Sequence, residues 1–181
     1  NVLSVTVDEG ATLSGEGQFN LAALYTLLDG QEVSDDVFFS YGTFINNGTL
    51  SPGNGIGTME INGSFEMGEK GNVVIEFGAD GTTDHLVIRD ETRPTTRDFG
   101  EQVDLMPSTG FYQGTQIIDL SEAFVVKSDS DSNSVLLDSA DFIESSPTLT
   151  MTGSVDINNV LTVTTLRDAG AYSQYASNSN T

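Results

Sequence analysis

The sequence contains no cysteine, so disulfide bonds cannot brace the fold, although small secreted domains commonly rely on them. A secreted chain without cysteine needs a reason for this absence. Passage in an unfolded form through a narrow pore is one such reason, because a crosslinked loop would jam there. Some cytosolic proteins lack cysteine by chance, so the absence alone does not identify the compartment.

Basic residues are scarce. Six Lys and Arg residues stand against 27 Asp and Glu residues, which gives a formal net charge of −21. A negative field of this size repels nucleic-acid phosphates and anionic lipid headgroups, so we expect neither nucleic-acid binding nor docking to a membrane surface. The carboxylates are spread along the chain, and we interpret them as a solvated, self-repelling surface. Collection of divalent cations by an extracellular surface is the alternative interpretation.

Long apolar runs are also missing, and no stretch approaches the ~18 residues of a membrane-spanning helix. No signal-peptide pattern opens the chain, because residues 1–4 already have the character of a strand. We therefore expect this chain to be part of a longer protein, with the signals for export, anchoring or processing lying outside it.

What is present favours short strands. Nineteen Gly residues, only four Pro residues and many Thr, Val, Ile and Asn residues predict an all-β fold with tight turns. Alternation such as Val5-Thr6-Val7 suits strands with one buried face. The only helix-like stretch of the first half, Leu21 to Leu28, precedes an acidic segment. We interpret it as part of an insertion between strands, at about residues 21–41.

A short motif recurs in the first half. Thr12-Leu13-Ser14 returns as Thr49-Leu50-Ser51, an offset of 49 − 12 = 37 residues, and Ile45 and Ile61 begin similar units 61 − 45 = 16 residues apart. Such units, with Asn and Gly at the corners, favour a right-handed parallel β-helix, because one coil cannot bury its inner face alone. We expect the longer offset to span two coils and the shorter one a single coil. A β-sandwich is the alternative.

Beyond Gly68 the strand pattern continues, but its spacing favours hairpins in a β-sandwich-like C-terminal element. Such an element would cap the last coil, whose open edge would otherwise pair with any passing strand. The predicted strands are Val73–Phe77, His85–Ile88, Val103–Leu105, Gln116–Leu120, Phe124–Val126, Ser134–Leu137, Thr148–Met151 and Val160–Thr164.

The most specific signal is the order of residues 42–65, which includes Thr49-Leu50-Ser51-Pro52-Gly53-Asn54-Gly55. This run resembles the passengers of autotransporters (type V secretion), which carry a GTLSPGNS-x-GT signature just before their autochaperone region. Gly55 stands where that family often has Ser. The segment from Asp84 to Ile88 is similar to the family's following motif, in which D-x-L precedes two apolar residues. The resemblance is good over about residues 42–90.

The resemblance implies a structural function. In that family the passenger emerges C-terminus first through an outer-membrane barrel, and its C-terminal region folds early and templates the coils above it. Here it implies β-helix coils over residues 1–64, a capping or autochaperone region over 65–166 and a linker over 167–181. The implied partners are the chain's own upstream β-helix and the downstream barrel, within an adhesin or virulence factor at the bacterial cell surface. We expect no enzyme activity, no cofactor, no metal and no membrane insertion of this fragment.

Two sequence features resemble catalytic or metal sites. His85 is the single histidine and lies beside Asp84 in a predicted strand. Because the chain has no Gly-x-Ser-x-Gly elbow, we interpret it as a strand histidine rather than a catalytic one. Asp129-Ser130-Asp131-Ser132-Asn133 mimics the start of a calcium loop, but the Gly and the Glu that such a loop requires are replaced by Ser134 and Ala140. We therefore expect a Ser/Asp hairpin tip there.

Arg89, Arg93 and Arg97 form the only basic cluster, and carboxylates interleave with them. A locally neutral, solvated loop is the favoured interpretation. If the module binds a partner outside its own polypeptide, we expect the contact at this cluster or at the insertion. Asn47-Gly48-Thr49 and Asn62-Gly63-Ser64 match glycosylation sequons, and we interpret them as corner turns.

Two other function classes are kept open. One is a carbohydrate-binding or carbohydrate-cleaving β-helix, similar to a polysaccharide lyase or a phage tailspike. Such an enzyme needs paired carboxylates or a basic residue in a groove, whereas Lys and Arg are scarce here. The other is an adhesive surface for a host ligand, which the sequence neither supports nor excludes.

Overall fold

The computed structural model describes residues 4–24, 39–90, 102–108, 114–127, 132–134, 141–142, 149–156 and 160–167. Every regular element in these ranges is a β-strand, so the fold is all-β, as the composition predicts. None of these residues belongs to a helix that is long and apolar enough to cross a membrane.

The strands are short, and glycine- or asparagine-containing turns separate many of them. In the first half they are β1 (Ser4–Val7), β2 (Thr12–Gly15), β3 (Gly17–Asn20), β4 (Ala22–Leu24), β5 (Phe39–Tyr41), β6 (Thr43–Asn46), β7 (Thr49–Pro52), β8 (Thr58–Asn62) and β9 (Ser64–Met67). In the second half they are β10 (Asn72–Phe77), β11 (His85–Arg89), β12 (Val103–Pro107), β13 (Gly114–Asp119), β14 (Phe124–Lys127), β15 (Ser132–Ser134), β16 (Asp141–Phe142), β17 (Leu149–Val155) and β18 (Val160–Arg167).

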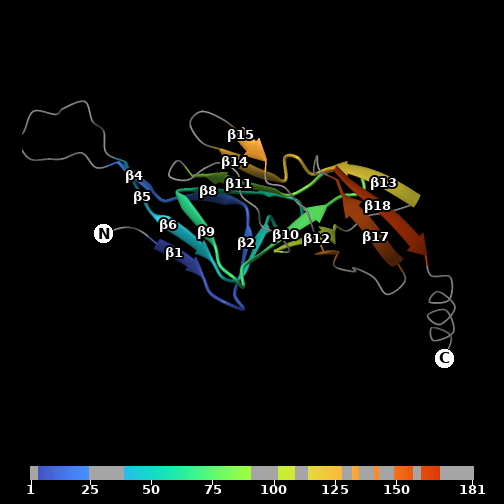
Figure 1. The fold of residues 1–181 in the computed structure, drawn as a ribbon, viewed down its shortest axis with the longest axis horizontal. Helices are drawn as coiled ribbons and strands as arrows, with labels where there is room; N and C mark the ends of the chain where they lie inside the picture. The colour runs from blue at the N-terminus through green and yellow to red at the C-terminus, as the bar shows by residue number, and fades with distance from the viewer. Residues whose placement is uncertain are drawn as a thin grey trace, which may run out of the picture.

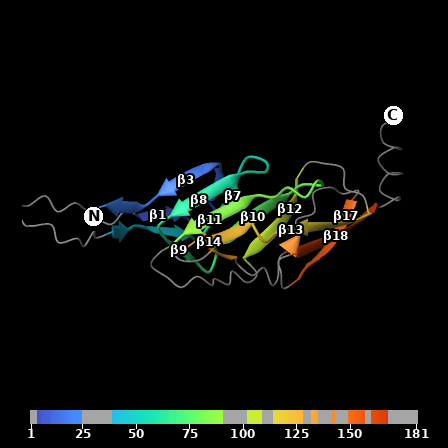
Figure 2. The same ribbon diagram turned by 90° about the horizontal axis from the view of Figure 1, so that it is seen from above.

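Three consecutive segments of the chain each contribute one strand to each of three sheets. We call them layer 1 (residues 4–20, β1–β3), layer 2 (residues 43–62, β6–β8) and layer 3 (residues 64–89, β9–β11). The sheets have the orders β1-β6-β9, β16-β12-β10-β7-β2 and β15-β14-β11-β8-β3. Pairing between layers is parallel throughout. The layers follow one another along the molecule, with β1 and β3 toward one end and β17 and β18 toward the other (Figures 1 and 2).

The predicted repeat is confirmed as a stacking register, since Thr12, Leu13 and Ser14 pair with Thr49, Leu50 and Ser51. The expectation that this offset spans two coils is wrong. The paired strands belong to adjacent layers, and the insertion between β3 and β6 accounts for the extra length. The shorter offset is not a coil either, because Ile45 and Ile61 lie in different sheets of the same layer.

The core lies between the three sheets and is built from stacked side chains. The Phe44 ring packs edge-on against Phe19 with centroids 5.3 Å apart and stacks on Phe65 at 5.9 Å. Leu50 pairs with Val73, which in turn pairs with Val103. Apart from Phe19, which is partly buried, these side chains are fully or almost fully buried. Complete burial of one such side chain contributes about 1.5–3 kcal/mol to stability.

The insertion begins as a pair of strands, so the helix-like interpretation of residues 21–28 is wrong where the structure describes it. β4 pairs antiparallel with β5, and residues 25–28 lie outside the described ranges. The cause is tertiary: Leu21 is buried, donates its N–H to Asn62 O at 2.7 Å and accepts the N–H of Gly42 at 2.8 Å. These bonds hold the two arms side by side in extended form, and the arms lead away from the layers (Figure 1).

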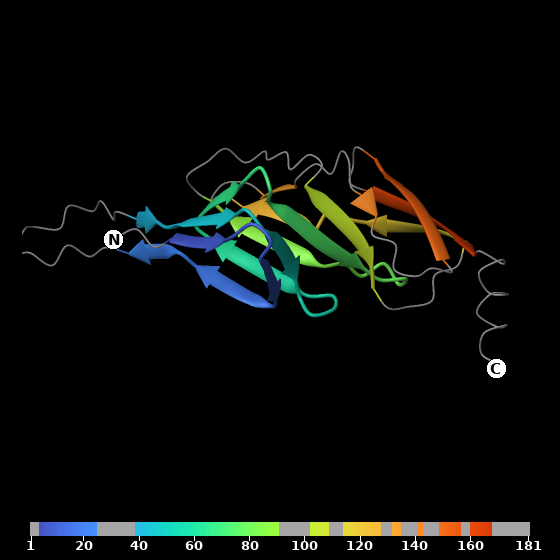
Figure 3. The ribbon, with the colours of Figure 1, turned by 90° about the horizontal axis from the view of Figure 1, so that it is seen from below.

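The prediction of hairpins beyond Gly68 is wrong for four pairs of strands. β10 pairs parallel with β7 and β12, and β11 pairs parallel with β8 and β14. A strand pattern does not reveal whether the partner is the next strand or a strand one layer away. The boundary at residues 64/65 therefore marks no change of pairing. Antiparallel pairing does occur for β14–β15 and for the sheet β13-β18-β17. Figure 3 shows that sheet in yellow and orange-red beyond the green strands. The predicted linker beyond Arg167 lies outside the described residues.

Candidate functional site

The signature stretch forms the corner between β7 and β8 and requires glycine at two positions. Gly53 has φ +86°, and a Cβ there would collide with the carbonyl oxygen of Gly55. A Cβ on Gly57 would lie 2.7 Å from the Gly53 Cα. The two glycines allow the loop to close on itself, and Gly53 then donates its N–H to Gly15 O of layer 1 at 2.9 Å. The order of residues in the signature thus has a steric cause.

Asp84 joins layer 2 to layer 3 at this corner. Its carboxylate is fully buried and accepts the N–H of Gly57 on Oδ1 and the N–H of Glu76 on Oδ2, each at 2.8 Å. Its own N–H is donated to Glu76 O at 2.8 Å, and the N–H of His85 is donated to Gly57 O at 2.9 Å. We call Asp84, Gly57 and Glu76 the Asp84 corner. The two recognised motifs, SPGNG-x-GT and D-x-L, therefore meet in space through one side chain.

Burial raises the pKa of Asp84 to about 6, because the charged form loses its hydration. The N–H groups of Glu76 and Gly57 oppose this rise by stabilising the carboxylate. The nearby Glu76 carboxylate adds to the rise, and His85 reduces it. With no exposed surface, the carboxyl group has no access to a substrate, so its role is to accept hydrogen bonds from two main-chain donors.

A second buried carboxylate follows the same strand. Asp90 comes directly after β11 and accepts the N–H of Phe65 at 3.2 Å. β11 is thus bracketed by acidic side chains that bind main-chain donors of other strands. The sequence carried a signal for both: Asp84 and Asp90 share the parity of the buried Leu86 and Ile88. Alternation of apolar residues marks the buried face of the strand but does not by itself indicate that acidic residues of the same parity are buried.

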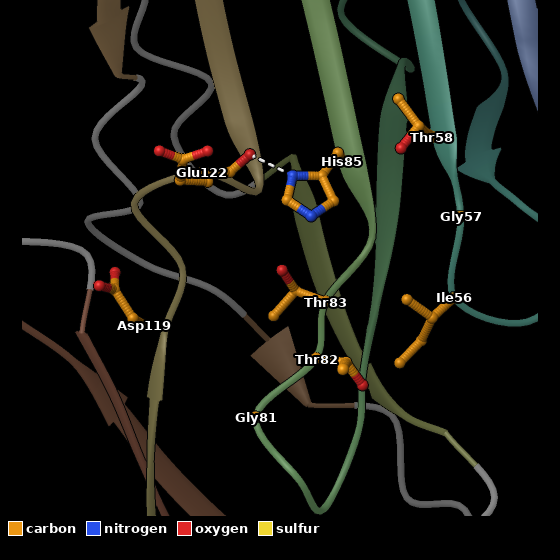
Figure 4. A pocket seen from close by; sticks show the side chains of 9 residues that line it. All are labelled: Ile56, Gly57, Thr58, Gly81, Thr82, Thr83, His85, Asp119 and Glu122. Atoms are coloured by element: carbon orange, nitrogen blue, oxygen red, sulfur yellow. Dashed lines mark hydrogen bonds between the residues drawn. The ribbon is translucent and has the colours of Figure 1, made fainter.

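His85 lies in an open groove beside the Asp84 corner, shown in Figure 4. The Nδ1 atom of its imidazole is 2.9 Å from Glu122 O, whereas the carboxylates of Glu122 and Asp119 point away from the ring. The groove has a volume of about 490 Å³ and is lined by Ile56, Gly57, Thr58, Gly81, Thr82, Thr83, His85, Asp119 and Glu122.

The groove does not form a catalytic triad. Asp119 accepts the N–H of Ser121 at 2.9 Å, and hydrogen bonds from Ser121 lower the pKa of this carboxyl. The Thr82 hydroxyl donates to Asp80 at 2.6 Å rather than to the imidazole. Among the described residues, His85 therefore has no carboxylate that orients it and no hydroxyl hydrogen-bonded to it, both of which nucleophilic catalysis of this type requires.

The described residues contain no group of three or more His, Asp or Glu side chains that could hold a metal ion. The calcium-like run is only partly described. β14 pairs antiparallel with β15, which contains Ser132 and Asn133 of this run, and this pairing confirms a hairpin, whereas residues 128–131 lie outside the described ranges.

Of the predicted basic cluster, the structure places only Arg89. Its guanidinium forms an ion pair with Glu60 of the neighbouring strand β8, and its side chain is 43% exposed. Arg93 and Arg97 lie outside the described residues, so the cluster as a whole is not placed. Asn47-Gly48 lies between β6 and β7, and Asn62-Gly63 consists of the last residue of β8 and the residue before β9, which confirms both pairs as corners.

The two ends of the stack differ. β1, β2 and β3 are terminal strands of their sheets, and among the described residues each has one partner. Of their inward side chains, Val5, Leu13 and Phe19 are only partly buried, whereas Val7 is buried. Within the part of the chain that the structure describes, layer 1 therefore presents strand edges without a second partner strand and a partly covered cross-section of the core.

The opposite end is covered by the sheet β13-β18-β17. Ile118, Leu161 and Val163 of this sheet are buried in the common core. The Gln116 side chain donates to Ala79 O at 2.9 Å and so ties the sheet to the turn between β10 and β11.

Comparisons of the chain with protein-family models, with curated proteins and with solved structures found no match.

Proposed function

We propose that this chain is a right-handed parallel β-helix closed by an antiparallel C-terminal cap. We further propose that it acts as the folding nucleus and end-cap of the passenger of a secreted autotransporter. It would stand at the bacterial cell surface, after transit through the outer membrane, within an adhesin or virulence factor. Its partners would be upstream coils of the same polypeptide and a downstream barrel.

The difference between the two ends of the stack carries this proposal. At the layer 1 end, β1, β2 and β3 have no second partner strand among the described residues, and partly buried side chains offer apolar surface. One further coil in the same register would satisfy both. The cap covers the other end, so growth is favoured in one direction only.

Local stability near the cap supports a role in nucleation. In a stacked fold a stable end removes the nucleation penalty for the next coil. The Asp84 corner binds layer 2 to layer 3 through two charge-assisted hydrogen bonds, and bonds of this kind contribute about 1.5–3 kcal/mol each before the cost of burial is subtracted. A nucleus of this type needs no catalytic residue.

The proposal is tested in the intact parent protein by deleting residues 65–166. We expect the upstream passenger to become protease-sensitive at the cell surface, because no formed coil would remain to template it. The matched control deletes only residues 25–38, within the insertion, and should leave protease resistance unchanged. Normal resistance after the larger deletion would refute the role in folding.

The carbohydrate alternative is tested separately. The groove at His85 is one site among the described residues that a sugar could enter, and its threonine hydroxyls are suitable hydrogen-bonding groups. A screen of acidic and neutral glycans for depolymerisation would distinguish the two functions. Turnover that is lost in His85→Ala would replace the structural proposal by an enzymatic one.

A further inference from the structure

The chain contains three Asn-Gly pairs, and the structure places them in different environments. Asn47-Gly48 is the corner between β6 and β7 within layer 2, and Asn62-Gly63 is the corner between β8 of layer 2 and β9 of layer 3. Asn54-Gly55 lies in the loop between β7 and β8. Asn-Gly is the dipeptide most prone to spontaneous deamidation, because glycine has no Cβ to hinder attack by its nitrogen on the preceding side chain.

The main chain at Asn47-Gly48 and at Asn62-Gly63 is fixed by hydrogen bonds and by packing. Gly48 is buried and donates its N–H to Asn46 Oδ1 at 3.2 Å. Gly63 is buried, donates its N–H to Arg89 O at 2.9 Å and lies so close to Leu21 that a Cβ would be 2.8 Å from the Leu21 Cβ. In both pairs the nitrogen that must attack is engaged in a hydrogen bond and the backbone around it is packed.

Asn54-Gly55 is open. The Asn54 side chain is exposed, and Gly55 has φ +103° with no atom within 4 Å of a Cβ built on it. Among the hydrogen bonds of the described residues, none uses the Gly55 N–H or the Asn54 amide. Neither the nucleophile nor the carboxamide has to break a contact before reacting.

We propose that Asn54 is a site of spontaneous deamidation in the folded protein. The Gly55 nitrogen attacks Asn54 Cγ and forms a C–N bond. The Cγ–Nδ2 bond breaks, and ammonia leaves with the proton from the Gly55 nitrogen. Water then hydrolyses the resulting succinimide at one of its two C–N bonds. The products are aspartate and isoaspartate, each with a new carboxylate and a released proton.

The modification changes a loop on which the stacking of layers depends. It adds a negative charge to a chain that already carries −21. The isoaspartate product also lengthens the main chain by one methylene group between Gly53, which bonds to layer 1, and Gly57, which bonds to Asp84. Deamidation of Asn54 would therefore alter, over time, the loop that connects layer 2 to layers 1 and 3.

The test uses the 181-residue chain incubated at neutral pH and 37 °C, once folded and once in denaturant. Deamidation is followed site by site by tandem mass spectrometry and by enzymatic methylation of isoaspartate. In the folded chain we expect Asn54 to react at least about tenfold faster than Asn47 and Asn62, because those two sites must first open locally. In denaturant all three should react within about threefold of one another, because the protecting contacts are gone.

Equal rates at the three sites in the folded chain, or a faster reaction at Asn47 or Asn62, would overturn the proposal. Asn54→Gln serves as the matched variant, since glutamine must form a six-membered imide and reacts far more slowly. It should abolish the early methylation signal. Persistence of that signal at the same rate would also overturn the assignment.

Discussion

Leu13 and Leu50 occupy the same place in the same tripeptide, Thr-Leu-Ser, and they pair in register across layers 1 and 2. Leu50 is fully buried, whereas Leu13 is partly exposed. Leu50 has a layer on either side, with Leu13 on one and Val73 on the other. Among the described residues, Leu13 has a strand partner on one side only, and that partner is Leu50. In a stacked fold the neighbouring layers thus bury a side chain, so the same tripeptide contributes differently to stability in different layers.

Truncation of each leucine in turn tests whether the neighbouring layers set the energetic difference between them. We expect Leu50→Ala to lower the free energy of unfolding by about 2–5 kcal/mol, because it leaves a cavity between two layers. Leu13→Ala should cost less than about 1.5 kcal/mol, since its side chain is partly solvated already. Urea unfolding of the 181-residue chain measures both. Equal costs would contradict the assignment of layer 1 as an open end, whereas a higher cost for Leu13→Ala in the longer parent would support a coil stacked on it.

The second comparison concerns the buried acid that joins layers 2 and 3. The pKa of Asp84 is about 6 in the folded chain and has an ordinary value of 3.8. Between these values the folded state binds the proton more tightly than the unfolded state. The contribution of Asp84 to stability is therefore greatest below pH 4 and falls as the pH rises through 6, by up to about 3 kcal/mol in total.

Urea unfolding of the native sequence and of Asp84→Ala from pH 4 to pH 7 checks this. The native sequence should lose more stability than Asp84→Ala as the pH rises, so the cost of the substitution should be larger at pH 4 than at pH 7. Asp80→Ala is the control, because Asp80 is exposed in a turn near the corner, and it should keep the native pH dependence. Parallel pH profiles for the native sequence and Asp84→Ala would show that Asp84 carries no shifted proton.

The smallest expected loss of stability concerns a partly exposed ion pair between two layers, which contrasts with the buried contacts above. The Arg89–Glu60 ion pair also joins layers 2 and 3, but the Arg89 side chain is 43% exposed. We expect Glu60→Gln to lower the free energy of unfolding by less than about 1 kcal/mol, because solvent and salt screen the pair. The difference from the native sequence should shrink further in 1 M NaCl. A cost as large as that of Leu50→Ala would mean that this pair contributes more than its exposure allows.

Local sequence predicted the strands better than their partners. The strands at Val73–Phe77 and His85–Ile88 were predicted to within one residue of β10 and β11, because alternation of apolar residues reports a buried face. Pairing was predicted wrongly for the same strands. Alternation has the same period whether the partner is the next strand or one layer away, so it contains no information about pairing.

At the candidate site, too, the sequence predicted local patterns but not the contacts between them. The sequence identified the glycine-rich signature and the D-x-L motif as separate patterns, and it could not show that they meet. The hydrogen bonds from Gly57 to Asp84 and from Glu76 to Asp84 span 27 and 8 residues of the chain. Such contacts depend on how the layers stack. Among the three Asn-Gly pairs, too, only the surrounding layers distinguish the open one from the two that are held.

The strand content, the repeat that sets the register of Leu13 on Leu50 and the glycines at the corners follow from local sequence, because alternation, spacing and φ are local properties. The passage of each of the three layers through three sheets, the burial of the Asp84 carboxylate between two layers and, among the described residues, the partly covered end at layer 1 depend on the tertiary structure. Burial and pairing are relations between distant segments, so they are defined only once the segments lie side by side.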